Sequence, residues 1–175
     1  MKILLMGHPN VGKSVLFNRL TGARVIESNY PGTTVDYTKG YMRLEGGDVE
    51  IIDVPGTFSL ESKDKAEEVA VKMLDETTEA VVVCVIDASK IERGLYLALE
   101  IIEKGYPVVI ALNMWDVARD KNIQIDVEKL EQILGVSVVP TTAISGEGIK
   151  ELVSKLKEAV PAGVDKIVAN VGGMA

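Results

Sequence analysis

The chain has 175 residues and a net charge of −7; 47% of its residues are hydrophobic and 26% are charged, the composition of one ordinary globular domain. The acidic balance, without any extended run of Lys and Arg, argues against a protein that binds nucleic acid non-specifically, since that function needs a basic surface. No stretch approaches the ~20 apolar residues of a membrane span and the N-terminal apolar run is too short for a signal peptide, so we expect this fragment to be soluble and cytoplasmic.

The first predicted element is a buried strand over residues 3–6, which leads into a glycine loop and then a helix over residues 15–20. This loop fills every fixed position of the phosphate-loop pattern G-x-x-x-x-G-K-[ST] with the sequence Gly7-His8-Pro9-Asn10-Val11-Gly12-Lys13-Ser14. Its backbone N–H groups and the positive end of the helix would face one anionic ligand. Lys13 would reach the β- and γ-phosphates of a nucleotide, and the Ser14 hydroxyl would bind Mg²⁺. We therefore predict a nucleotide-binding protein whose phosphate-binding residues are Asn10, Val11, Gly12, Lys13, Ser14 and Val15.

The rest of the chain alternates apolar strands with amphipathic helices, apart from one hairpin. We expect hairpin strands over 37–45 and 49–53, further strands over 80–87, 107–113 and 136–139, and helices over 65–75, 91–104, 127–134 and 149–160. This order predicts an α/β fold with a mostly parallel six-stranded sheet, one antiparallel edge strand and helices on both faces. The polar loops 23–36 and 57–64 flank the phosphate loop in the sequence, as nucleotide-sensitive switches would, although ordinary surface loops remain an alternative.

A carboxylate and a glycine end the second hairpin strand, in the sequence Asp53-Val54-Pro55-Gly56. A carboxylate at a strand end beside the phosphate loop can hold Mg²⁺, usually through water. The missing side chain of Gly56 would let the backbone approach and bond the γ-phosphate.

Two later strand ends carry residues suited to a guanine base. Asn113-Met114-Trp115-Asp116 follows one strand, and the carboxylate of Asp116 can accept two hydrogen bonds from the N1–H and 2-amino groups of guanine. Adenine offers no such pair and would leave the carboxylate unpaired. Asn113 would brace the phosphate loop and the base edge. After the last strand, the loop that contains Thr142 would offer a backbone N–H to guanine O6, and we expect it to be that of Ala143.

These residues together resemble the GTPases of the translation-factor-related branch, over nearly the whole chain to about residue 156. Within that branch the chain is most similar to the N-terminal G domain of the ferrous-iron transporter B (FeoB) family, a resemblance carried by residues 7–14, 29–34, 53–60 and 92–97. The last of these segments has no nucleotide role that its chemistry explains. The resemblance implies the P-loop GTPase fold, with GTP or GDP as ligand.

The resemblance also implies roles for individual residues. Thr34 would complete the Mg²⁺ shell in the GTP state, beside Ser14 and Asp53. Asn10 would bind a K⁺ ion that neutralises charge between the phosphates, as an arginine finger does in other GTPases. The residues implied in catalysis are Lys13, Thr34 and Gly56.

Two departures from the general GTPase pattern bear on rate and affinity. Thr57 stands where many GTPases have a water-orienting Gln, so we expect slow intrinsic turnover, about 10⁻³ s⁻¹ or below. Met114 replaces the Lys of the guanine motif, which suggests weaker nucleotide binding and faster exchange. His8, the single histidine, is expected to be an exposed loop side chain, with a catalytic role as the alternative.

The predicted function is a K⁺-stimulated regulatory GTPase domain of a ferrous-iron transporter, at the cytoplasmic face of the membrane. Residues 1–160 would form the G domain, and residues 161–175 a linker or the start of a following domain. Its partners would be helical and transmembrane domains of the same polypeptide, with a homo-oligomer left open and no nucleic acid. The alternatives are a stand-alone GTPase of ribosome assembly or tRNA modification, and a switch that binds GTP but barely cleaves it.

Overall fold

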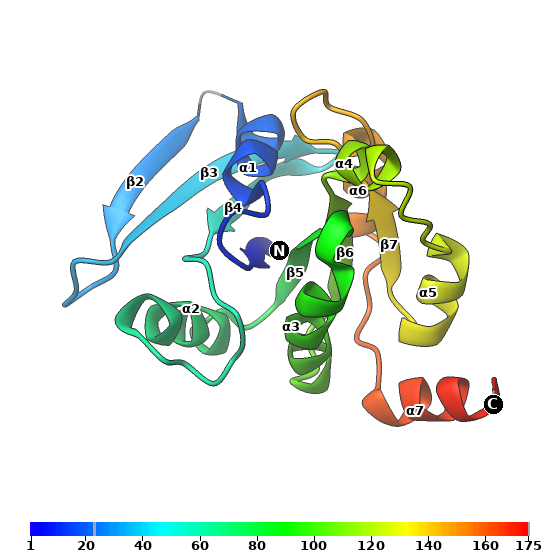
Figure 1. Ribbon diagram of the computed structural model, residues 1–175. Coiled ribbons are helices and arrows are strands. Elements are labelled where there is room, and N and C mark those ends of the chain that lie inside the picture. Colours follow the sequence, from blue (N-terminus) through cyan, green and yellow to red (C-terminus); the bar gives the residue numbers. More distant parts are fainter. Residues whose placement is uncertain (23, 175) are drawn as a thin grey trace.

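The computed structural model describes residues 1–22 and 24–174. The first residue of the predicted loop 23–36 and the last residue of the predicted tail 161–175 therefore lie outside the described residues. One seven-stranded sheet runs through the molecule in the order β2-β3-β4-β1-β5-β6-β7 (Figure 1). Its strands are β1 (Lys2–Gly7), β2 (Val25–Asn29), β3 (Asp36–Leu44), β4 (Gly47–Asp53), β5 (Ala80–Asp87), β6 (Val108–Asn113) and β7 (Ser137–Pro140).

Strand β3 is antiparallel to both of its neighbours. It pairs antiparallel with β2 on one side and with β4 on the other, whereas β4, β1, β5, β6 and β7 are parallel to one another. The carboxyl ends of the parallel strands therefore meet at one edge of the sheet, where open α/β sheets bind their ligands.

Helices cover both faces of this sheet. They are α1 (Lys13–Thr21), α2 (Lys65–Glu76), α3 (Ile91–Glu103), α4 (Trp115–Asp120), α5 (Val127–Leu134), α6 (Ile149–Leu156) and α7 (Val164–Gly172), with one 3₁₀ turn, η1 (Ala88–Lys90). Alternate residues of the buried strands face opposite sides, so that β1 contributes Ile3 and Leu5 to a core with α1 and α6. It contributes Leu4 and Met6 to a second core with α2, α3, α5 and α7.

The predicted α/β architecture is confirmed, and the sheet has one strand more than the predicted six. Val25 and Ile26 of the additional strand, β2, are exposed, so the segment lacks the apolar alternation by which a strand is recognised in a sequence. Because β2 pairs along the outside of β3, the antiparallel strand lies one position inside the edge.

Two helices were not predicted, and one is shorter than predicted. α4 has only six residues, too few for a helical period to be visible. α6 ends at Leu156 instead of residue 160. α7 forms within the tail 161–175, which was expected to be a linker or the start of a following domain, and Ile167 buries its side chain against the core.

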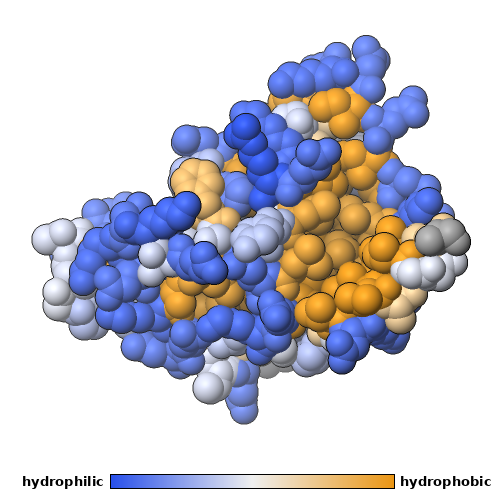
Figure 2. Space-filling view, turned by 60° about the horizontal axis from the view of Figure 1, so that its bottom comes forward, coloured by the Kyte–Doolittle hydropathy of each residue, from blue (hydrophilic) through white to orange (hydrophobic). Residues whose placement is uncertain are grey.

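The outer side of α7 is apolar. Val168 is 64% exposed and Val171 52% exposed. Figure 2, which brings the underside of Figure 1 forward, shows a hydrophobic area on the side of the molecule where α7 lies. Among the described residues, no helix is both long and apolar enough to cross a membrane.

Helix α3 lies unusually close to β5. A Cβ atom added at Gly94 would come within 2.5 Å of a methyl carbon of Ile86, so only glycine allows this approach. Gly94 belongs to the segment 92–97 that resembles FeoB without a chemical reason. Its role in this structure is to pack the helix against the sheet.

Candidate functional site

The phosphate loop connects β1 to α1 at the carboxyl edge of the sheet. Asn10 has a φ of 64° and Gly12 a φ of 83°, so the chain turns twice through the left-handed region within three residues. A side chain at Gly12 would overlap the amide nitrogen of Asn113, which fixes glycine at this position. The helix that follows begins at Lys13, as the motif predicts.

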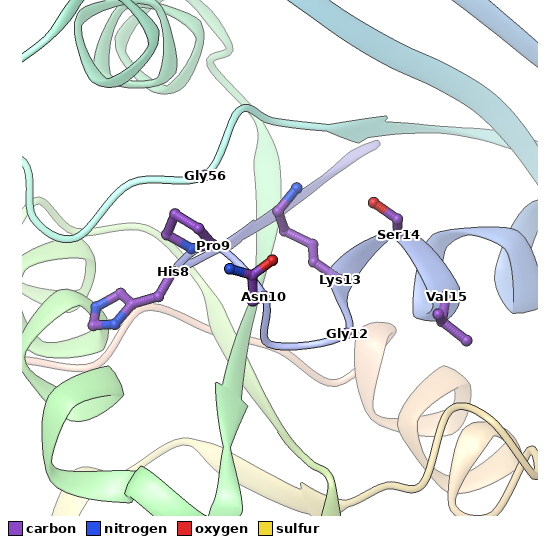
Figure 3. Close-up of a pocket in the computed structure, with 8 residues that line it drawn as sticks. All are labelled: His8, Pro9, Asn10, Gly12, Lys13, Ser14, Val15 and Gly56. Atoms are coloured by element: carbon purple, nitrogen blue, oxygen red, sulfur yellow. The ribbon is translucent and has the colours of Figure 1, made fainter.

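A pocket of about 400 Å³ opens over this loop. Its lining combines six of the predicted binding residues with two others of the loop region: His8, Pro9, Asn10, Gly12, Lys13, Ser14, Val15 and Gly56. In Figure 3 the side chains of Lys13 and Asn10 point toward the same space, whereas the ring of His8 is turned away from both. The chain segment that follows β4 passes along the other side of this space at Gly56.

Lys13 connects the loop to the end of β4. Its ammonium group donates to the carboxylate of Asp53 and, at 2.6 Å, to the carbonyl oxygen of Val54. The side chains of Lys13 and Asp53 are 11% and 12% exposed, so this ion pair is largely shielded from water. The Ser14 hydroxyl lies 3.4 Å from the other carboxylate oxygen of Asp53. Of the three side chains predicted to handle phosphate and Mg²⁺, Lys13 and Ser14 thus both contact Asp53.

Asn113, at the end of β6, joins the phosphate loop to the loop after β7. Its amide nitrogen donates to the carbonyl oxygen of Val11 at 2.9 Å. Its amide oxygen accepts from the hydroxyl of Thr141 and from the backbone N–H of Ala143, both at 3.1 Å. Asn113 is buried, and all its polar atoms are used. The predicted bracing of the phosphate loop by this residue is confirmed.

The remaining residues of the predicted base site lie around this junction. Asp116 is in the first turn of α4 and is partly exposed. Met114 approaches the phosphate loop, because its terminal methyl lies 3.9 Å from the position that a Cβ of Gly12 would take. The replacement of lysine by methionine therefore keeps packing beside the loop and removes only the charge. The hydroxyl of Thr142 is buried and has no hydrogen-bond partner among the described residues.

The second polar loop, residues 57–64, is held by side chains from two helices and by one of its own hydroxyls. Glu67 of α2 is buried and its carboxylate accepts from the backbone N–H groups of Phe58, at 3.1 Å, and Lys63, at 2.7 Å. Glu100 of α3 accepts from the N–H of Leu60 at 2.9 Å. Thr57 is fully buried, and its hydroxyl donates to the carbonyl oxygen of Ser59 at 2.7 Å.

His8 is half-buried and contacts the same loop, whereas the sequence predicted an exposed side chain. Its ring lies 5.0 Å from that of Phe58, and Nε2 is 3.1 Å from the Phe58 carbonyl oxygen. Burial lowers the pKa of His8 below its usual 6.5, and the Arg93 charge lowers this pKa further. The Phe58 carbonyl and the Glu67 carboxylate act in the opposite direction. The net shift keeps the ring neutral near pH 7.

Thr34, by contrast, is not among the residues that line the pocket. It lies in the connection between β2 and β3, at the tip of a hairpin that extends away from the phosphate loop (Figure 1). Tyr30, in the same connection, is hydrogen-bonded to Glu76 at the end of α2. The structure therefore brings together all the predicted metal ligands except Thr34.

Sequence reasoning missed the residues that hold the two loops from outside. The pattern Asp64-x-x-Glu67 at the start of α2 is a capping-box signal and would have drawn attention to Glu67. Arg19 of α1 donates to the carbonyl oxygens of Ala143 and Ile144. No local pattern predicts that contact, because its partners are more than a hundred residues apart in the sequence.

A family model described as ferrous iron transport protein B matches residues 1–156. The Fe(2+) transporter FeoB of Legionella pneumophila (strain Paris) is 43% identical over 157 residues, which cover 87% of this chain and 21% of the relative. The Fe(2+) transporter FeoB of Escherichia coli O157:H7 is 37% identical over 174 residues, covering 97% and 22% of the two chains. The chain therefore spans about a fifth of the length of these curated relatives.

Solved structures agree with this match. The cytosolic domain of L. pneumophila FeoB superposes with a TM-score of 0.85 at 40% identity, covering 92% of this chain and 66% of that one. The cytosolic domain of the T. maritima FeoB iron transporter in its GMPPNP form has a TM-score of 0.86 at 39% identity, covering 90% and 63%. A mutant NFeoB of S. thermophilus bound to GDP has a TM-score of 0.85 at 39% identity, covering 92% and 63%.

Proposed function

The chain belongs to the ferrous iron transport protein B family, and on this premise we propose that it binds and slowly hydrolyses GTP as the regulatory domain of a ferrous-iron transporter. One observation carries the proposal: the contact of Lys13 and Ser14 with Asp53 beside an open pocket at the carboxyl edge of the sheet. Relatives crystallised with GDP and with GMPPNP support the choice of ligand.

Phosphate binding would fall to the loop 10–15. The backbone N–H groups at the start of α1 and the ammonium of Lys13 would face the β- and γ-phosphates. Lys13 is paired with Asp53 in this structure, so a nucleotide must take the ammonium from the carboxylate. That exchange replaces one anionic partner by another and releases Asp53 to act as a metal ligand.

The residues present fit a Mg²⁺ ion. The hydroxyl of Ser14 lies next to a carboxylate oxygen of Asp53, and Mg²⁺ prefers oxygen ligands. Thr34 would complete this set only after the β2–β3 connection has moved toward the pocket. When bound, Mg²⁺ would offset the negative charge that develops on the phosphate oxygens.

Asn10 is our candidate for a K⁺ site. Its side chain points into the pocket beside Lys13 (Figure 3), and its amide oxygen is a ligand of the type that alkali cations accept. A cation there would supply the positive charge that other GTPases take from an arginine finger.

Selection of guanine would rest on Asp116 and on the loop 141–145. The carboxylate of Asp116 would accept from N1–H and the 2-amino group of the base. The backbone N–H of Ala143, our candidate for the O6 contact, is engaged with Asn113. It would have to be shared between Asn113 and O6 when guanine binds.

The position of Thr57 supports slow hydrolysis. Its hydroxyl is buried and donates to the chain itself, so it does not face a water molecule in line with a γ-phosphate. Without a water-orienting amide, turnover of about 10⁻³ s⁻¹ or below is expected. The transporter role implies helical and transmembrane domains of the same polypeptide beyond a G domain of residues 1–160, which would lie at the cytoplasmic side of the membrane.

Single-turnover hydrolysis of GTP in K⁺ and in Na⁺ tests the proposal. We expect cleavage that is about tenfold faster in K⁺, and loss of this difference in Asn10→Ala. Asn18→Ala, an exposed substitution on α1, is the control and should retain the difference. If no GTP is cleaved over hours in either cation, the domain is a switch that binds GTP without hydrolysing it, and the proposed hydrolysis is wrong. Detection of the native polypeptide as a soluble band near 18.9 kDa would contradict the transporter role.

A further inference from the structure

Arg19 binds the backbone of the loop after β7. It lies in α1, the helix that begins in the phosphate loop. Its Nε donates to the carbonyl oxygen of Ala143 at 2.8 Å, and a second guanidinium nitrogen donates to the carbonyl oxygen of Ile144. A side chain that binds two successive carbonyls constrains the backbone between them, and a charged donor strengthens both bonds.

The peptide groups of Ala143 are therefore fixed from two sides. Asn113 holds its N–H, and Arg19 holds its carbonyl oxygen. Since Asn113 also binds Val11, the phosphate loop, its helix and the loop 141–145 form one closed ring of contacts. Of the side chains whose hydrogen bonds close this ring in the described part of the chain, that of Arg19 carries a charge and that of Asn113 is neutral.

A second arginine contacts the same loop in a different way. Arg119 of α4 reaches the carboxylate of Glu147 at 3.2 Å, and the two side chains are 55% and 47% exposed. This is a surface ion pair between side chains, of a kind that contributes little to stability. It does not bind the loop backbone, so it provides a matched comparison for Arg19.

We propose that Arg19 is a positioning residue for guanine recognition: it holds the loop 143–144 in place and so sets the rate at which GDP dissociates. The inference rests on the proposed GTP-binding function and adds a residue that touches neither nucleotide nor metal. Because Arg19 is absent from the lining of the phosphate pocket, its effect falls on the base and leaves the phosphate chemistry unchanged.

Release of GDP carrying a fluorescent group on its ribose, chased with excess GDP, tests this inference. Arg19→Met keeps the length of the side chain and removes every donor, so release should become about tenfold faster. Arg19→Lys keeps the charge but lacks the rigid guanidinium fork that spans two carbonyls, so it should release GDP at an intermediate rate. Arg119→Met should change the rate by less than about twofold. Under saturating GTP, kcat of Arg19→Met should stay within about twofold of the parent value while KM rises.

The outcomes separate this inference from the function beneath it. If the unmodified chain does not bind the labelled GDP, the proposed function fails. If the chain binds it and Arg19→Met releases it at the parent rate, or no faster than Arg119→Met, the role of Arg19 is overturned. A fall in kcat equal to the rise in release rate would also overturn it, because it would indicate general damage to the fold. Should Arg19→Met not fold, the comparison of Arg19→Lys with Arg119→Met decides in the same way.

Discussion

The phenolic hydroxyl of Tyr30 lies 2.8 Å from both carboxylate oxygens of Glu76. Tyr30 opens the connection that contains Thr34, and Glu76 is the last residue of α2. The hydrogen bond to Glu76 raises the pKa of Tyr30, so its hydroxyl stays protonated and able to donate. The first polar loop is thus attached to α2 at a point outside the phosphate pocket.

Removing this hydroxyl should favour the arrangement in which Thr34 reaches the pocket. We expect Tyr30→Phe to bind a non-hydrolysable GTP analogue with Mg²⁺ about threefold more tightly, while GDP affinity is unchanged. Tyr41→Phe is the control, since the Tyr41 hydroxyl makes only an exposed contact of 3.4 Å with Glu50. Calorimetric titration of both nucleotides gives the comparison, and equal gains for GDP and the analogue would count against a switch role for Tyr30.

Lys13→Ala should weaken nucleotide binding by about a hundredfold or more, because the charge that would face the phosphates is lost. It also leaves Asp53 shielded from water without its partner, so the free energy of unfolding should fall by about 1–3 kcal/mol. Equilibrium titration and urea denaturation measure the two effects. Lys72→Ala, which breaks an exposed ion pair with Glu68, should change neither. An unaltered affinity in Lys13→Ala would refute the phosphate assignment.

Asp116→Asn should change the base preference of the site from guanine to xanthine. The asparagine amide can donate to the O2 of xanthine and accept from its N1–H, whereas it meets the 2-amino group of guanine with the wrong polarity. We expect GTP affinity to fall by about a hundredfold and xanthosine triphosphate affinity to rise. Asp120→Asn, in the same helix but exposed, should leave both affinities unchanged. Competition between the two nucleotides measures the preference, and a retained preference for GTP would place the base elsewhere.

His8 should titrate below its ordinary pKa of 6.5, because burial disfavours its charged form. As the pH falls below 6.5, the unfolded chain takes up the proton before the folded one does, so stability decreases through this window. Because His8 is the single histidine, its ring signals give an unambiguous titration by NMR. A midpoint at or above 6.5 would mean that the ring is solvated and separate from Phe58.

Much of the fold could be predicted from periodicity alone. The helix over residues 127–134 has the bounds expected from its apolar stripe, and the buried strands β5 and β6 are apolar along their length. Strand β2 and helix α7 were not predicted. Val25 and Ile26 in β2 are exposed. Helix α7 buries only one side chain, and the glycines near its ends favoured the prediction of a linker.

The site divides in the same way. Lys13, Ser14 and Asp53 could be brought together from the sequence, because motif spacing and strand order fix them at one sheet edge. The contacts of Arg19 and Glu100 could not, since each joins side chain to backbone across a distance that only the complete fold defines. Thr34 lies in the β2–β3 connection and does not line the pocket, and no residue pattern places that connection relative to the phosphate loop.

The close packing of Gly94 against Ile86 fits α3 tightly onto the sheet. A shift of α3 along β5 would separate Gly94 from the side chain of Ile86, which occupies the space that a Cβ atom at residue 94 would need. Six residues further on, Glu100 holds the N–H of Leu60. A rearrangement that carries Leu60 away from α3 must therefore break this hydrogen bond. The segment 92–97 thus packs α3 against the sheet through Gly94, and Glu100 of the same helix ties the second polar loop to that packed helix.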